Sequence, residues 1–194
     1  MKSIIRKSTY RAIYRLLDRV SPVPYDCGIL CGSACCIPED GASDSDDFDM
    51  GIYLLPGEEK VHDKKDPWLI WTKERAEDYE FPDSWRGPVY FVRCRSAADC
   101  RRPLRPIQCR TFPALPHLTE DGRLYLIKND LELPYSCPLL EGGTELLDPR
   151  FLRATWTCWK HLIRDPLIRD LVRMDSEGRT ELRILYPAGQ DEIE

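Results

Sequence analysis

Long apolar stretches are missing from this sequence. No run approaches the ~18–20 apolar residues that a membrane-spanning helix needs, so we expect no transmembrane segment in the 194 residues. Several enzyme motifs are missing as well, because the chain has no P-loop, no G-x-G-x-x-G, no G-x-S-x-G and no H-E-x-x-H. These absences argue against a P-loop nucleotidase, a dinucleotide-dependent enzyme, a serine hydrolase and a zincin.

A secretory leader and a basic surplus are also missing. Ile4 and Ile5 are followed at once by Arg6 and Lys7, which leaves no apolar core for a signal peptide. We therefore expect a cytoplasmic protein. The chain carries 28 Lys and Arg against 33 Asp and Glu, a net charge of -5, which argues against a nucleic-acid partner. A protein partner is left open.

The composition is that of an ordinary globular chain, with 42% hydrophobic and 31% charged residues. The length suits one domain over residues 1–194, with a cysteine-rich core at about 25–140 and a helical part at about 148–178. We expect an α+β fold, small and irregular, organised by metal, with an N-terminal helix, short strands and C-terminal helices. The patterns predict a helix at 8–20, strands near 51–55, 68–71, 89–92 and 124–127, helices starting at Asp148-Pro149 and Asp165-Pro166, and a last strand at 182–186.

The first helix is strongly basic. Residues 2–19 hold six Lys or Arg side chains and a single acid, Asp18. A membrane-surface or mitochondrial targeting helix is one interpretation. We favour a packed first helix with a solvated basic face, because Ile13, Leu16 and Leu17 recur at helical spacing.

Residues 39–49 form an acidic segment. A calcium-binding loop requires ligands at alternating positions, a central Gly and a Glu at its end. Phe48 stands at a ligand position and the central Gly is missing. We therefore expect a solvated loop.

Cysteine is the most informative residue type, with nine in the chain. Four of them fall within ten residues and three within sixteen, and small residues separate the first four. In a reducing compartment such clustering is typical of metal ligands rather than of disulfides. The expected metal ligands are Cys27, Cys31, Cys35, Cys36, Cys94, Cys100, Cys109 and Cys137.

The spacing does not distinguish a four-thiolate zinc site from an iron–sulfur cluster, because both place thiolates tetrahedrally around the metal. It also leaves the number of centres open. Cys35 and Cys36 are adjacent, and adjacent side chains of an extended segment point to opposite sides. We therefore expect at least one ligand of the first group to share a centre with the later cysteines.

Two other side chains were weighed as ligands. Cys158 falls on one helical face with Phe151 and Leu162, where a cysteine usually serves as a small core residue. We expect it outside every centre. His117 follows Cys109 and is the best substitute ligand among the histidines.

Arginines crowd the second cysteine group. Arg105 and Arg110 flank Cys109, and we expect both to donate to thiolate sulfur or to nearby carbonyls, just outside the ligands of the metal. The alternatives are a solvent-exposed surface pair, an anionic ligand held by the arginines, or an RNA-binding patch. The stretch lacks the interleaved aromatic residues that an RNA reader uses.

The two cysteine groups together resemble the YkgJ-type family of zinc- or iron-chelating cysteine-cluster proteins. That family has a C-x-x-C-x-x-C-C box, two more cysteines, an R-P-x-x-C-R-x-[FY]-P box and a late cysteine. Residues 105–113 read RPIQCRTFP and fit the second box, whereas the first box here has one extra residue in each gap. Over residues 25–140 the resemblance implies a metal- or cluster-binding domain. A related domain in flagellin-modifying lysine N-methylases adds an enzymatic alternative.

The prediction from the sequence is therefore a metal-binding protein with one or more cysteine-ligated zinc or iron–sulfur centres. One alternative is an iron–sulfur-dependent enzyme that modifies proteins or carries out redox chemistry. The other is a protein-interaction module with purely structural zinc, whose partner surface would be marked by Trp68, Trp71 and Trp85.

Overall fold

The computed structural model describes residues 2–36, 51–96, 100–130, 133, 135–143, 146–179 and 181–187, without the side chain of Cys36. The acidic segment 39–49 lies outside these residues. The chain has an α+β fold, as the sequence predicts, with helices and two small antiparallel sheets. The helices are α1 Lys7–Leu17, α2 Gly28–Cys31, α3 Ile107–Thr111, α4 Pro138–Glu141, α5 Pro149–Leu162 and α6 Pro166–Ser176. The 3-10 turns are η1 Ala34–Cys36, η2 Glu58–Lys60, η3 Ala76–Asp78 and η4 Arg102–Leu104.

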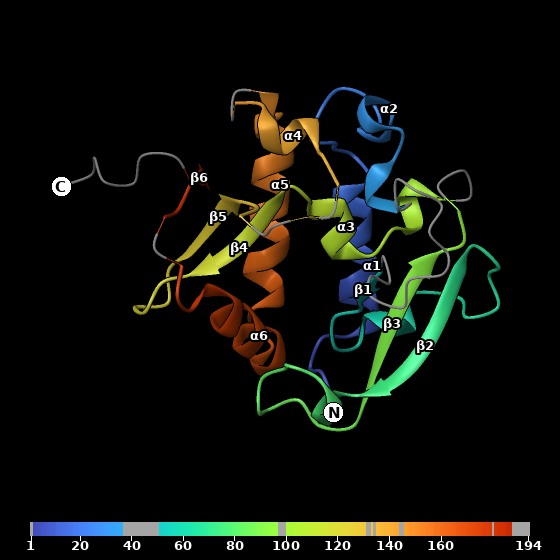
Figure 1. Ribbon diagram of the computed structural model, residues 1–194. Coiled ribbons are helices and arrows are strands. Elements are labelled where there is room, and N and C mark those ends of the chain that lie inside the picture. Colours follow the sequence, from blue (N-terminus) through green and yellow to red (C-terminus); the bar gives the residue numbers. More distant parts are fainter. Residues whose placement is uncertain are drawn as a thin grey trace.

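Both sheets are three-stranded and antiparallel in the described residues. The first has the order β1-β3-β2 and the second the order β4-β5-β6. Figure 1 draws the two sheets on opposite sides of the helices α1 and α5. The strands are β1 Ile52–Tyr53, β2 Leu69–Arg75, β3 Pro88–Cys94, β4 Ala114–Leu118, β5 Leu124–Lys128 and β6 Ile184–Tyr186.

The main core lies between α1, α5 and the second sheet. Helix α1 contacts α5, and α5 packs across β4, β5 and β6. The α1 residues Tyr10 and Leu17 are almost fully buried, which answers the question of the basic first helix: its apolar face packs and its basic face is solvated. No helix in the described part of the chain is long and apolar enough to cross a membrane.

The two C-terminal helices begin where the sequence predicts. Asp148 accepts a hydrogen bond from the Arg150 amide at the start of α5. Asp165 accepts from the Leu167 and Ile168 amides at the start of α6. A proline follows each aspartate, where a fixed φ favours the first helical turn.

Asp165 also binds residues that are distant in the sequence. Its second oxygen accepts the Ser3 hydroxyl at 2.6 Å and the Ile4 amide at 2.7 Å. One buried carboxylate therefore caps α6 and fastens the beginning of the described chain to it.

The strands of the first sheet differ in length from the prediction. The expected strand at 51–55 is reduced to β1, because the chain turns at Pro56 and at Gly57, whose φ is 90°. Strands β2 and β3 are longer than expected because they pair along their whole length, from Leu69 opposite Cys94 to Arg75 opposite Pro88.

The tryptophans of this sheet do not form an exposed surface. Trp68 is buried against Leu69 and Val92, and Trp85 is buried in a separate small cluster. The expectation of a partner surface marked by tryptophans is therefore wrong for Trp68 and Trp85, whose apolar area fills two small cores, whereas Trp71 is only partly buried.

Candidate metal centre

The first three cysteines lie on two short turns. Cys27 precedes α2, Cys31 ends it, and Cys35 lies in η1. Between them Gly32 and Ser33 take left-handed conformations in succession, with φ of 60° and 63°. This reversal folds the second turn back on the first, and the Ser33 amide donates to the Gly28 carbonyl at 2.9 Å.

The pair Cys35 and Cys36 does not lie in an extended segment. Both residues belong to the 3-10 turn η1, so the alternating geometry that we assumed for them is wrong. The local cause is the left-handed Gly32 and Ser33, which start a turn rather than a strand. The side chain of Cys36 lies outside the described residues.

The later cysteines come from four separate places in the fold. Three of them lie at or beside the end of a secondary-structure element, and the fourth lies in a short helix. Cys94 ends β3, Cys100 precedes η4, Cys109 lies in α3, and Cys137 directly precedes α4.

Tertiary structure brings the two cysteine groups together around Cys35. A negative charge on Cys35 raises the pKa of Cys27, Cys109 and Cys137, after the larger effect of burial in each case. A charge on Cys31 acts on Cys137 in the same way. A charge shifts the pKa of another group in this way only when the two are near each other. Figure 1 likewise draws α2 and α4, whose ends carry Cys31 and Cys137, at the same end of the molecule.

Cys109 has an ambivalent surrounding. The residue is exposed to solvent over part of its surface. Protein atoms surround the thiol on its other sides. Burial among them, followed by the charges of Cys35 and Cys100, raises the pKa of the Cys109 thiol to about 12. Since the charges of Cys35 and Cys100 both act on Cys109, this residue lies near cysteines of both groups.

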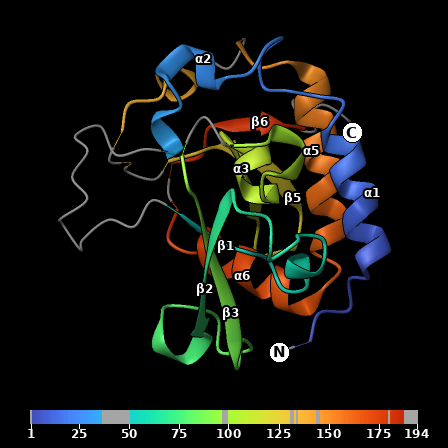
Figure 2. The ribbon, with the colours of Figure 1, turned by 90° about the vertical axis from the view of Figure 1, so that its right-hand side faces the viewer.

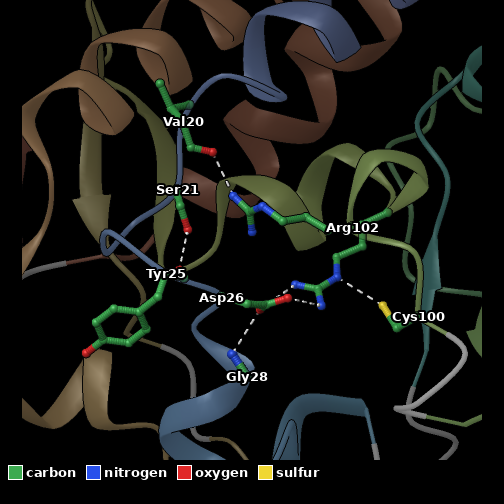
Figure 3. Close-up of polar contacts among 8 residues, drawn as sticks. Val20, Ser21, Tyr25, Asp26, Gly28, Cys100 and Arg102 are labelled. Carbon is green, nitrogen blue, oxygen red and sulfur yellow. Dashed lines mark hydrogen bonds and ion pairs between the residues drawn. The ribbon is translucent and has the colours of Figure 1, made fainter.

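Arg105 connects Cys100 with the first cysteine group. Its Nε donates to Cys100 Sγ at 2.9 Å, and its two terminal nitrogens lie 3.4 and 3.3 Å from the Asp26 carboxylate. Figure 3 labels Cys100 and Asp26 and marks these contacts with dashed lines. Burial lowers the pKa of Arg105, but Cys100 and Asp26 raise it by more, so the group stays a cation.

Asp26 and Arg102 complete this junction. The Asp26 carboxylate also accepts the Gly28 amide at 3.1 Å, which fixes the first turn of α2 beside Cys27. Arg102 donates to the Val20 carbonyl at 2.7 Å. Sequence reasoning did not single out Asp26, although an acid directly before the first cysteine and opposite an arginine-rich stretch was a usable signal.

Arg110 is buried but does not reach a sulfur in any contact seen here. It donates to Asp18 Oδ1 at 2.5 Å and to the Pro103 carbonyl at 3.1 Å, and its guanidinium lies over the Tyr14 ring. Its side chain is 1% exposed, so a solvent-exposed surface pair is excluded. Arg110 ties the helix that carries Cys109 to α1.

A buried glutamate holds the same helix from the other side. Glu58 is fully buried, and its Oε1 accepts the Ile107 amide at 2.8 Å and the Tyr14 hydroxyl at 2.7 Å. Its Oε2 accepts the Leu55 amide at 3.0 Å. Burial raises the pKa of Glu58, and these hydrogen bonds work against that shift. Nothing in the sequence marks Glu58 as important, because its partners lie 3 to 49 residues away.

The donor set fits a metal in kind. Thiolates are the preferred ligands of zinc and of iron–sulfur clusters, and the cysteines around Cys35 are close enough for their charges to interact. Yet no group of three His, Cys, Asp or Glu side chains among the described residues is arranged so that it could hold a metal ion. Among the described thiols, several lie near one another, but no three are set at ligating positions.

Two candidate ligands lie elsewhere. Cys158 is fully buried in the main core with Phe151 and Leu162, as its helical spacing predicts. His117 is buried on β4, where its charged neighbours are Arg179 and Asp130 rather than cysteines.

No family model, curated protein or solved structure matches the chain. The resemblance to the YkgJ-type family therefore stays a prediction from its motifs.

Proposed function

We propose that this protein binds zinc or an iron–sulfur cluster through cysteine thiolates. The observation that carries the proposal is the position of Cys35, which lies close to Cys27 of its own group and to Cys109 and Cys137 of the later one. Sequence clustering alone would not bring together cysteines that are about a hundred positions apart.

The charge balance supports a cation at this place. Several thiolates held close together repel one another, and each raises the pKa of the next. Arg105 offsets part of that repulsion at Cys100, and a bound metal would offset more. Metal binding commonly orders the loops of cysteine-rich domains, and here it would have to bring the thiolates into ligating positions.

The candidate ligands are Cys27, Cys31, Cys35, Cys109 and Cys137, with Cys100 beside Arg105, and with Cys94 and Cys36 as further donors. A reducing compartment such as the cytoplasm agrees with this use of thiols, since no disulfide joins the described cysteines. The proposal concerns binding and leaves any catalysed reaction open.

The test is metal analysis of the full chain purified without oxygen. Zinc predicts a colourless protein that releases zinc to a chelator, and an iron–sulfur cluster predicts a brown protein with a broad visible band. The variants C35S and C109S should lose most of the metal, whereas C158S, altered in the core away from the centre, should keep it.

Two results would contradict the proposal. One is wild-type protein that holds no stoichiometric metal after anaerobic reconstitution with zinc or with iron and sulfide. The other is C35S and C109S retaining as much metal as C158S.

A further inference from the structure

A cavity of about 810 Å³ lies outside the candidate metal centre. It is bounded by the end of β5, by α4 and by the segment that follows α6, and none of the described residues in its lining is a cysteine. Its volume is within the ~300–1,000 Å³ typical of small-molecule sites. The residues of its lining that matter for recognition are Lys128, Asp130, Leu140, Arg179 and Arg183.

Arg179 is one of the cations of this lining. Its side chain is 10% exposed, and its Nε donates to Asp130 Oδ2 at 3.1 Å. Its Nη1 is buried and has no hydrogen-bond partner in the described part of the chain. A buried guanidinium N–H without an acceptor is costly, and the group is built to present parallel donors to a carboxylate or phosphate.

A second buried polar atom next to Arg179 is also unsatisfied. His117 on β4 is 5% exposed, and its Nδ1 has no hydrogen-bond partner among the described residues. Burial lowers the pKa of His117, and the nearby charge of Arg179 lowers it further. The imidazole therefore stays neutral and adds no positive charge beside Arg179.

Lys128 adds a second buried cation. It is 5% exposed, and its Nζ donates to the Gly142 carbonyl at 2.5 Å, which uses one of the three ammonium donors. Among the described residues of the lining, Arg179 and Arg183 join Lys128 as cations, beside the acids Asp130 and Glu181. Cationic donors are thus present on the wall of the cavity, where an anion could bind.

We propose that this cavity binds a small molecule through an oxyanion group, either a carboxylate or a phosphate, held by Arg179 and Lys128. Asp130 orients the Arg179 guanidinium from one side and competes with the ligand for it. Leu140 and Leu182 supply the apolar part of the wall. The inference is independent of the proposed metal centre.

The experiment is calorimetric titration of the full chain with inorganic phosphate and, separately, with succinate, in chloride buffer at constant ionic strength. We expect one of the two probes to bind with a Kd of about 1 mM or tighter. R179M should weaken that binding about tenfold or more, because it removes the bidentate donor. D130N should tighten it several-fold, because the competing carboxylate is neutralised.

The exposed ion pair of Arg123 and Asp121, in the turn between β4 and β5, provides matched controls. R123M and D121N change the net charge by the same amounts and should leave the binding as it is. If R179M does not fold, the comparison of D130N with D121N decides. The proposal is overturned if neither probe binds, if R123M weakens binding as much as R179M, or if D130N binds no more tightly than D121N.

Discussion

Glu58 and Ile107 are joined by a hydrogen bond of 2.8 Å between the Glu58 carboxylate and the Ile107 amide, across 49 positions of sequence. Ile107 is the first residue of α3, the helix that carries Cys109 and Arg110. A fully buried carboxylate on the turn after β1 thus determines where this helix starts. The position of one candidate ligand thus depends on a residue that is not itself among the candidate ligands.

Replacing Glu58 should therefore affect stability strongly. E58L leaves the Ile107 and Leu55 amides buried without an acceptor and removes the carboxylate that accepts the Tyr14 hydroxyl. It should lower the free energy of unfolding by about 3 kcal/mol or more. E58Q keeps one carbonyl oxygen and should cost less. Urea denaturation measures both. The neighbouring variant E59Q is the control, and an equal loss in E59Q and E58L would contradict the assignment.

His62 should make stability depend on pH. Its Nε2 lies 2.9 Å from the Tyr14 hydroxyl. That hydroxyl donates its proton to Glu58, so the imidazole donates to it from Nε2–H. Burial lowers the pKa of His62 from 6.5 to about 4. Below pH 6.5 the unfolded chain binds the proton more readily, so the contribution of His62 is complete above pH 6.5 and is lost as the pH falls towards 4.

The size of that loss is on the order of 3 kcal/mol between pH 7 and pH 4. Glu58, whose pKa is raised, acts in the opposite direction. The difference between wild type and H62F at each pH removes the Glu58 contribution that both proteins share. H161Q, changed at an exposed histidine, should follow the wild-type curve. A pH dependence in H62F equal to that of wild type would show that His62 is not responsible.

Cys137 and Cys158 are both buried, but only Cys137 lies near other thiols among the described residues. C158A should lower stability by about 1 kcal/mol, through the small cavity that it leaves beside Phe151 and Leu162, and should retain the metal. C137A should lose metal. Metal analysis of the two variants, together with thermal denaturation, separates a packing role from a ligand role. Equal metal content in both would remove Cys137 from the centre.

Arg105 should influence metal retention through Cys100 and Asp26. R105M removes the donor to sulfur and the link to the first cysteine group, and we expect metal affinity to fall about 10–100-fold. Competition with a chelator of known affinity measures the change. R95M, which removes an exposed arginine that donates to the Pro67 carbonyl, should have no such effect. If both variants release metal alike, general charge is responsible.

Removing the metal should loosen one part of the molecule more than the rest. The turns at 27–36 and the segment 100–111 carry most of the candidate ligands, whereas α1, α5 and the second sheet share an apolar core. Figure 2 shows α2 near the top of the view, and α1 and α5 along its right-hand side. We expect a lower Tm after chelation, with faster amide exchange in those two segments first. An unchanged cooperative transition after complete metal removal would refute a structural role for the metal.

The sequence by itself determined the features whose cause is local. Asp148-Pro149 and Asp165-Pro166 each start a helix. The aspartate side chain accepts the amide two residues on, and in Asp165 also the amide three residues on, while the φ of proline is already helical. The turn at Asp121-Gly122 similarly joins β4 to β5, with Gly122 at a φ of 83°. The packing of Cys158 in the core followed from helical periodicity alone.

Only the tertiary structure decided which distant groups meet. Arg105 was expected near sulfur, but its choice of Cys100 and its pairing with Asp26 depend on how η4 packs beside the turn before α2. No local sequence pattern predicts the contacts of Glu58, the neighbours of Cys35 or the pairing of Arg179 with Asp130. Local conformation is fixed by dihedral preferences within a few residues, whereas these contacts exist only because burial of apolar surface brings remote segments together.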